Sequence, residues 1–195
     1  MPSPVLVLNL HPARQSFCQG LADAYAAGVR AAGGTAQQIN LHDLTFDIDF
    51  EQAGFKGAKP LEPDLERIMT ALGAARHVTL ATPMWWGGLP AKAKGLFDRA
   101  FLPGRAFDPR QKRLGLPKPL LAGRTARLIM TSDTPGWAFW PMYGAAMKRQ
   151  IKGQILSYVG IRPMSFTHFS PVETSTPEIR EAWLAKAEKL GGKDT

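Results

Sequence analysis

Residues 77–107, HVTLATPMWWGGLPAKAKGLFDRAFLPGRAF, combine a short apolar run, an aromatic and glycine-rich turn, and a helical pattern. The apolar run Val78–Ala81 predicts a strand, and Pro83 ends it because proline has no N–H for a central ladder. Pro90 suits the first turn of a helix, and the apolar residues that follow it recur at helical spacing. The segment therefore predicts a strand, a loop and a helix, the unit in which α/β proteins place ligand sites.

The turn inside this segment contains two adjacent tryptophans and two adjacent glycines. Exposed indoles are costly in water, while glycine lets the backbone approach another group closely. A flat aromatic ligand would satisfy both features. The alternative is that Trp86 is an ordinary core indole, because large aromatic residues are mostly buried. The turn is formed by Met84, Trp85, Trp86, Gly87 and Gly88.

Composition indicates one soluble globular domain over residues 1–195, with 45% hydrophobic and 21% charged residues. The single cysteine, Cys18, excludes an intrachain disulfide framework. The N-terminal MPSPVLVLNL lacks the basic region and cleavage pattern of a signal peptide. We therefore expect a cytoplasmic protein without stable membrane insertion.

The net charge of +8 favours anionic partners. The simplest interpretation is a solvated basic face that keeps the protein soluble. A groove for a nucleotide phosphate is the second interpretation. Nucleic acid is not expected, because no nucleic-acid-binding motif accompanies the charge. Many of the cations fall in the segments 105–127 and 148–152.

Strand-like and helix-like segments alternate along the chain. This alternation predicts a parallel sheet with helices on both faces. Five strands suggest the flavodoxin-like order 2-1-3-4-5, with a ligand crevice between the carboxyl ends of the first and third strands. Residues 102–123 are expected to form a long loop. The expected strands are 5–10, 35–41, 78–81, 125–131 and 164–169, and the expected helices include 62–75, 142–158 and one starting after Thr176.

The loop after the first strand carries a candidate phosphate site. Ser16 and Gln19 have the spacing of a capping box, so a helix is expected to begin at Phe17. Its first N–H groups would be free, and a helix N-terminus attracts anions. The alternative is that Ser16 only caps the helix and His11 only packs. The position beside the tryptophan turn favours a ligand with a phosphate and a ring.

Several common catalytic motifs are missing. The sequence contains neither G-x-G-x-x-G nor a P-loop, and it lacks the G-x-S-x-G of a nucleophile elbow. The four histidines lack metal-ligand spacing, so no metal is expected. Cys18 at a helix N-terminus could be a nucleophile, although a lone buried cysteine is more often packing.

Three motifs resemble the NAD(P)H:quinone oxidoreductase family, flavodoxin-like flavoenzymes of the DT-diaphorase type. They are HPARQSFCQGLADAY, TPMWWGGLPAKAKGLFDRAF followed by GRAF, and SDTPGW. The resemblance implies FMN or FAD, with hydride passing from NAD(P)H to the flavin and then to a quinone-like acceptor by a ping-pong route. It also implies a homodimer. FMN is favoured, because the long FAD-binding members carry a C-terminal extension beyond the length of this sequence.

The resemblance also implies roles for particular residues. Trp86 and Phe107 would hold the nicotinamide and the acceptor, with Phe107 reaching the substrate cavity, and Tyr143 is the candidate acid/base tyrosine. No histidine matches the acid/base histidine of the long members. The flavin phosphate and ribityl chain would be held by His11, Ser16, Phe17 and Cys18, and the ring by Pro83, Met84, Trp85, Trp86, Gly87, Thr131, Ser132, Asp133 and Thr134.

Two other functions fit the same residues. Ancillary flavoproteins of potassium-efflux transporters also resemble this family, and the basic segment 105–127 would then meet the partner. An FMN electron carrier of the flavodoxin type is less consistent with the charge, since those proteins are generally acidic.

Overall fold

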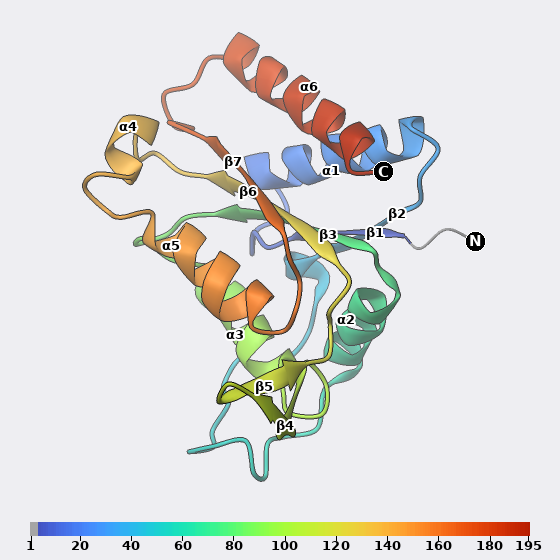
Figure 1. Ribbon diagram of the computed structural model, residues 1–195. Helices are drawn as coiled ribbons and strands as arrows, with labels where there is room; N and C mark the ends of the chain where they lie inside the picture. Colours follow the sequence, from blue (N-terminus) through green and yellow to red (C-terminus); the bar gives the residue numbers. More distant parts are fainter. Residues whose placement is uncertain (1–3) are drawn as a thin grey trace.

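The computed structural model describes residues 4–195 and contains a five-stranded parallel sheet (Figure 1). The strand order, β2-β1-β3-β6-β7, is the expected order 2-1-3-4-5. Relative to the expected bounds, β2 is one residue shorter at each end, and β3 begins one residue earlier and runs on through Pro83. The strands are β1 (Val5–Asn9), β2 (Ala36–Asn40), β3 (His77–Pro83), β6 (Thr125–Thr131) and β7 (Met164–Phe169).

Burial along the strands follows their place in the sheet. Every residue of β1 and β3 is buried, as expected for strands covered on both faces. In β2 only Ile39 is fully buried, which suits a more polar strand at the edge. The polar character of residues 36–40 therefore correctly predicted an edge position.

Helices cover both faces of the sheet (Figure 1). Val5 and Val7 of β1 belong to a core shared with α1 (Phe17–Ala31) and α6 (Pro177–Lys193). Leu6 and Leu8 point to the opposite core, because successive side chains of a strand alternate between faces. That second core includes residues of α2 (Pro63–Ala74), α3 (Ala91–Ala100), α5 (Ala146–Arg149) and the π-helix η2 (Gln150–Ser157).

Helices α1 and α6 pack closely because each has a glycine at the contact. A Cβ atom on Gly28 would lie 1.8 Å from the carbonyl oxygen of Glu188. A Cβ atom on Gly191 would lie 2.0 Å from the carbonyl oxygen of Tyr25. The backbones therefore approach to a distance that no other side chain allows.

The expected helix at 142–158 begins later than the sequence pattern suggested. Gly144 and Ala145 have φ angles of 56° and 49°, which interrupt a right-handed helix. The chain instead forms the short helix α4 (Gly136–Phe139), a turn, and then α5 and η2. The interruption brings Tyr143 into a loop.

The expected long loop at 102–123 is wrong for its middle part. Residues Phe107–Arg113 and Leu116–Pro119 form a separate antiparallel pair, β4 and β5, at the lower edge of the molecule in Figure 1. The pairing contains an irregularity between Asp108 and Lys112. Prolines and charges interrupt the alternation that usually reveals a strand.

The segment between η1 (Leu41–Asp43) and α2 follows the surface as expected, and a buried arginine fixes it. The Arg99 guanidinium donates to the backbone carbonyls of Asp47 and Pro60 and to the Glu62 carboxylate. A side chain of helix α3 thus satisfies polar groups of a loop that has few backbone partners of its own.

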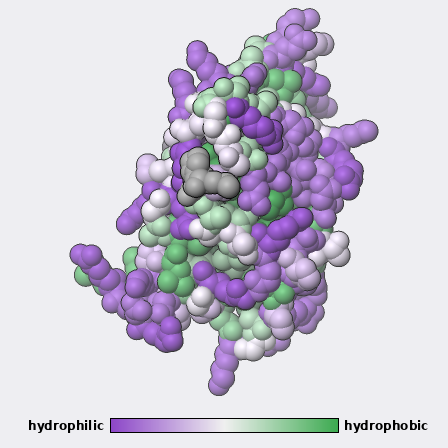
Figure 2. All heavy atoms as spheres, turned by 90° about the vertical axis from the view of Figure 1, so that its right-hand side faces the viewer, coloured by the Kyte–Doolittle hydropathy of each residue, from purple (hydrophilic) through white to green (hydrophobic). Residues whose placement is uncertain are grey.

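Hydrophilic residues cover most of the face that lies to the right in Figure 1, and hydrophobic residues form small, separated patches on it (Figure 2). Among residues 4–195, no helix is both long and apolar enough to cross a bilayer.

Candidate functional site

Two adjoining cavities open at the carboxyl ends of β1, β3 and β6, the position expected for the ligand crevice. Their volumes are about 210 Å³ and 600 Å³. Met84, Ser132 and Asp133 line both cavities, so the two are direct neighbours. The small cavity is otherwise lined by His11, Gln15, Ser16, Phe17, Cys18, Pro83, Trp85, Thr131 and Val172, and the large one by Trp86, Gly87, Thr134, Phe139, Tyr143, Ala146 and Met147.

Asn9, the last residue of β1, fixes the first loop of the small cavity. Its Oδ1 accepts a hydrogen bond of 3.1 Å from the His11 N–H. Its Nδ2 donates to Gln19 Oε1 in helix α1 over 2.7 Å. This fully buried amide therefore connects the strand, the loop and the helix.

Ser16 caps α1 as the sequence pattern predicted. Its Oγ accepts from the N–H of Gln19 over 3.2 Å. The Gln19 side chain instead donates to Asp23, so the reciprocal half of a capping box is absent here. The N–H groups of Phe17 and Cys18 have no carbonyl one turn earlier, and the first turn contains no acidic residue. The small cavity therefore has the donors and the dipole of an anion site.

His11 contributes a neutral ring to the same cavity. Its ring lies edge-on to Trp85, with centroids 5.6 Å apart. The His11 Nδ1 lies 3.0 Å from the Ala13 nitrogen and 3.3 Å from the Ala13 carbonyl oxygen, so it accepts from the N–H in one tautomer and donates to the carbonyl in the other. Partial burial lowers the pKa of His11, so the neutral ring prevails at pH 7.

Cys18 faces the interior, an environment that disfavours the nucleophilic thiolate. Its Sγ lies 3.1 Å from Thr131 Oγ1 at the end of β6. Burial raises the pKa of the Cys18 thiol to about 12, although the hydrogen bond with Thr131 acts in the opposite direction. The thiol thus remains protonated and joins α1 to β6.

The tryptophan turn is a tight two-residue turn. Trp85 and Gly88 exchange two backbone hydrogen bonds of 2.9 Å. Trp86 and Gly87 have φ angles of 50° and 76°, a conformation that favours Asn-Gly. The relative exposure of Trp86 is 107%, so its interpretation as a core indole is wrong. Trp85 is 45% exposed and packs on His11.

The exit loop of β6 is held from the neighbouring strand. The Ser132 N–H donates to the carbonyl of Phe169, and Ser132 Oγ lies 2.8 Å from His168 Nε2. Asp133 Oδ1 accepts from the Glu173 N–H over 2.6 Å. These contacts fix the loop over both cavities.

His168 is the functional candidate that sequence reasoning missed. Its ring packs against Phe139, with centroids 5.0 Å apart, and lies nearly parallel to Phe166 at 6.2 Å. Burial lowers the pKa of His168. A lone histidine in a short strand carries no sequence signal, and only the pairing of β6 with β7 brings it beside Ser132.

Tyr143 lies at the large cavity, as its candidate role requires. It is 57% exposed and shares the cavity lining with Phe139 and Met147. The role of Tyr143 in acid/base chemistry stays a prediction. Neither Phe139 nor Met147 was among the expected site residues, and their positions at the cavity depend on the break at Gly144.

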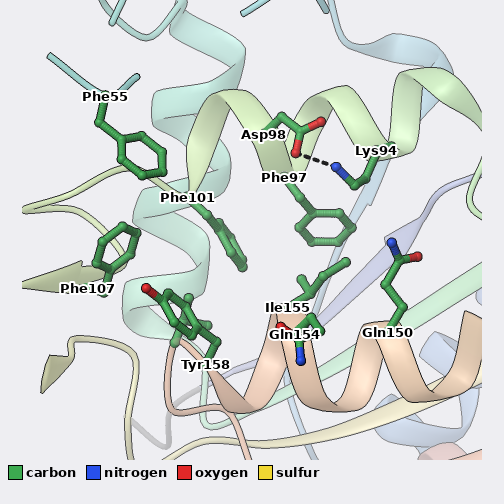
Figure 3. A pocket seen from close by; sticks show the side chains of 11 residues that line it. Phe55, Lys94, Phe97, Asp98, Phe101, Phe107, Gln150, Gln154, Ile155 and Tyr158 are labelled. Carbon is green, nitrogen blue, oxygen red and sulfur yellow. Dashed lines mark hydrogen bonds and ion pairs between the residues drawn. The ribbon is translucent and has the colours of Figure 1, made fainter. Parts of the chain in front are cut away.

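Phe107 does not share a cavity with Trp86. It lines a separate hollow of about 430 Å³ between α3 and η2 (Figure 3). Its ring packs edge-on against Phe55 and Tyr158, with centroids 5.7 Å and 5.3 Å apart. The two hollows have no lining residue in common, so Phe107 and Trp86 do not face one ligand within a single copy of the chain.

Among residues 4–195, no cluster of histidine, cysteine and carboxylate side chains is suited to a metal ion. The site therefore rests on backbone donors, aromatic rings and hydroxyl groups. A cavity that offers an anion site beside an aromatic-lined cavity, at the switch point of a doubly wound sheet, defines a protein that binds a phosphorylated aromatic ligand.

The family profile described as flavodoxin-like fold matches residues 3–190, and the chain belongs to this family. An FMN-dependent NADH:quinone oxidoreductase of Ruegeria pomeroyi is 29% identical over 172 residues, which cover 80% of this chain and 82% of that protein. FMN-dependent NADH:quinone oxidoreductase 1 of Bradyrhizobium diazoefficiens is 31% identical over 110 residues, or 55% of this chain and 51% of the relative.

Among solved structures, the chain is similar to an NAD(P)H:quinone oxidoreductase from Methanothermobacter marburgensis. The TM-score is 0.79 at 23% identity, over 97% of this chain and 94% of the other. This likeness supports the fold assignment.

Proposed function

We propose that the protein is an FMN-dependent NADH:quinone oxidoreductase. The observation that carries the proposal is the junction of the two cavities through Met84, Ser132 and Asp133. One cavity has the donors of a phosphate site and the other has the aromatic lining of a ring site. The named activity of the Ruegeria and Bradyrhizobium relatives supports the same assignment.

The donor set of the small cavity fits the phosphate of FMN. The N–H groups of Phe17 and Cys18 and the hydroxyl of Ser16 lie at the positive end of a 15-residue helix. When its proton is on Nε2, the neutral ring of His11 adds a donor without adding charge. Phosphate would therefore be held mainly by backbone amides, without an arginine clamp.

The large cavity fits an aromatic ring. A volume of about 600 Å³ is within the range of small-molecule sites. Trp86 stands exposed at its edge, and Met84 and Tyr143 contribute to its lining. FMN supplies hydride transfer when it is bound, and the protein contributes orientation, polarity and exclusion of water.

Ser132 is the polar group best placed to act on the ring. Its hydroxyl can donate either to His168 Nε2 or to the carbonyl of Thr134, at 2.8 Å and 3.3 Å. A neutral His168 can either accept a hydrogen bond from Ser132 or donate one to it. Ser132 can therefore donate or accept a hydrogen bond at the cavity. Tyr143 offers a second hydroxyl in the lining of the same cavity.

The acceptor would lie against Trp86, where a quinone can stack on an exposed indole. The protein would act in the cytoplasm as a homodimer. In that dimer Phe107 would contribute to the acceptor site of the partner, since it does not meet Trp86 within one chain. Size measurement in solution, with and without Phe107→Ala, tests that arrangement.

The function is tested by adding FMN to the purified chain and recording its visible spectrum. We expect bound flavin, bleaching on anaerobic addition of NADH, and return of the oxidised spectrum when a quinone is added. Trp86→Asn should keep the turn and the flavin while it raises the KM for the quinone, because Asn suits the positive φ. A chain that fails to bind either FMN or FAD would contradict the proposal.

A further inference from the structure

The hairpin β4–β5 ends in a turn with unusual chemistry. Leu114 and Gly115 have φ angles of 51° and 80°, the conformation of a two-residue turn that favours Asn-Gly. Leu114 instead carries a branched apolar side chain that is 95% exposed. The turn thus combines backbone strain with an exposed leucine at one residue.

The tryptophan turn shows the same departure. Trp86 has a φ angle of 50° and an exposed ring, and it stands at the edge of the large cavity. In both turns a strained apolar side chain lies exposed at the edge of a cavity and not in the core. By the same physical reasoning, Leu114 is suited to contact something outside the protein. Its side chain is exposed and its backbone is strained, so neither stabilises the fold.

Cations surround the apolar tip. A hollow of about 610 Å³ runs from the tip to the end of η2, and no carboxylate lines it. Its apolar lining includes Leu114 and Leu116, the latter 63% exposed. The neighbouring Asp108 is buried and paired with Arg110, so it does not offset the charge. The cations of the hollow are Lys112, Arg113, Lys118 and Arg162.

We propose that the β4–β5 hairpin docks reversibly on an anionic lipid bilayer. Leu114 and Leu116 enter the interfacial layer, and the surrounding cations meet acidic headgroups. The hairpin forms a two-stranded sheet of its own, separate from the five-stranded sheet, in the lower part of the molecule (Figure 1).

The charge pattern favours lipid over a protein partner. Two leucines on a narrow turn bury too little area for a specific protein interface, whereas a fluid bilayer accepts single apolar side chains. Four cations without a carboxylate match the uniform negative charge of a lipid surface. This inference does not depend on the flavin chemistry proposed above.

The test is co-sedimentation of the full chain with vesicles. We compare phosphatidylcholine vesicles with vesicles in which about a third of the lipid is phosphatidylglycerol. We expect binding to the anionic vesicles alone, and weakening when the salt concentration rises, because salt screens exposed charges.

Two variants locate the surface. Leu114→Asn relieves the turn, so it folds at least as well, and it should weaken binding about tenfold. Lys112→Ser with Arg113→Ser should weaken it roughly 30-fold, since each cation near an acidic surface contributes a factor of about five. Lys186→Ser with Lys189→Ser removes the same charge from the exposed side of α6 and should weaken binding far less.

Several results would overturn the proposal. One is no binding to anionic vesicles, and another is equal weakening by the α6 variant. A third is a change in oligomeric state, without a change in vesicle binding, when Leu114 is replaced. That result would make the hairpin a contact between copies of the chain.

Discussion

Ser132 Oγ and His168 Nε2 lie 2.8 Å apart and connect the exit loop of β6 to the edge strand β7. Because Ser132 lines both cavities, a change in the protonation state of His168 changes the hydrogen bonding of the Ser132 hydroxyl at the site. Through this contact with Ser132, His168 can influence the ligand although it is distant in sequence from the other site loops.

Replacing His168 should change the pH dependence of flavin reduction. Burial lowers the pKa of His168 below its ordinary value of 6.5. Below that lowered pKa the protonated His168 ring cannot accept a hydrogen bond from Ser132. The rate of flavin reduction by the wild-type chain should therefore fall at acidic pH. In His168→Gln the rate of flavin reduction should no longer fall at acidic pH. Its value at higher pH should be about fivefold lower than that of the wild type, the equivalent of one hydrogen bond. Stopped-flow reduction by NADH measures both.

Ser132→Ala should show the same loss of the fall at acidic pH. Ser165→Ala, an exposed position on β7, the strand of His168, should leave the pH profile unchanged. An unaltered fall at acidic pH in His168→Gln would contradict the coupling.

A negative charge at the helix cap should remove FMN. Ser16→Asp keeps a good N-cap, so the helix remains stable, but the carboxylate repels the phosphate. We expect at least a tenfold weaker FMN affinity, measured by fluorescence titration, with the melting temperature of the flavin-free chain unchanged. Ser16→Asn is the matched control, because it caps without charge; equal FMN affinity in Ser16→Asp and Ser16→Asn would show that the phosphate binds elsewhere.

The contact between α1 and α6 should not tolerate a methyl group. Gly28→Ala places a Cβ atom 1.8 Å from the Glu188 carbonyl oxygen, so the helices must separate. We expect a loss of about 2–4 kcal/mol in the free energy of unfolding, measured by urea denaturation.

Gly73→Ala is the control, because its Cβ atom meets nothing within 4 Å in helix α2. That variant should gain about 0.5–1 kcal/mol from the reduced entropy of the unfolded chain. Similar effects of the two substitutions would contradict the close packing.

Acid should destabilise the fold through His77. Its Nδ1 lies 2.7 Å from Thr125 Oγ1, and burial lowers its pKa to about 4, although the Asp194 carboxylate at 3.4 Å acts in the opposite direction. The unfolded chain therefore binds the proton first as the pH falls. The free energy of unfolding should decrease between pH 6.5 and about 4, by at most about 3 kcal/mol.

His77→Gln should remove this part of the slope. His11 and His168 act in the same direction, so the quantity to compare is the difference between wild type and variant. A difference that does not change with pH would show that His77 keeps its ordinary pKa.

The sheet was predictable because its central strands are continuous apolar runs and proline or glycine separates them from the helices. The Ser16 cap and the tryptophan turn were predictable for a related reason, since each is a local pattern. The hairpin β4–β5 was not, because Pro109, Pro117 and the charges between them hide the alternation of a strand.

The remaining parts of the site depend on tertiary structure. His168 reaches Ser132 only through the pairing of β6 with β7, and Tyr143 reaches the large cavity only because Ala145 interrupts the helix. The place of Phe107 depends on packing between α3 and η2, which no local pattern encodes.

The contact of Cys18 with Thr131 bears on chemical durability. Quinones are electrophiles that arylate thiolates, and Cys18 is the only cysteine of the chain. With a pKa of about 12, its sulfur is almost entirely in the unreactive thiol form at neutral pH. An enzyme that handles such electrophiles would thereby keep its single thiol out of their reach, and repeated turnover would not inactivate it by alkylation at this position.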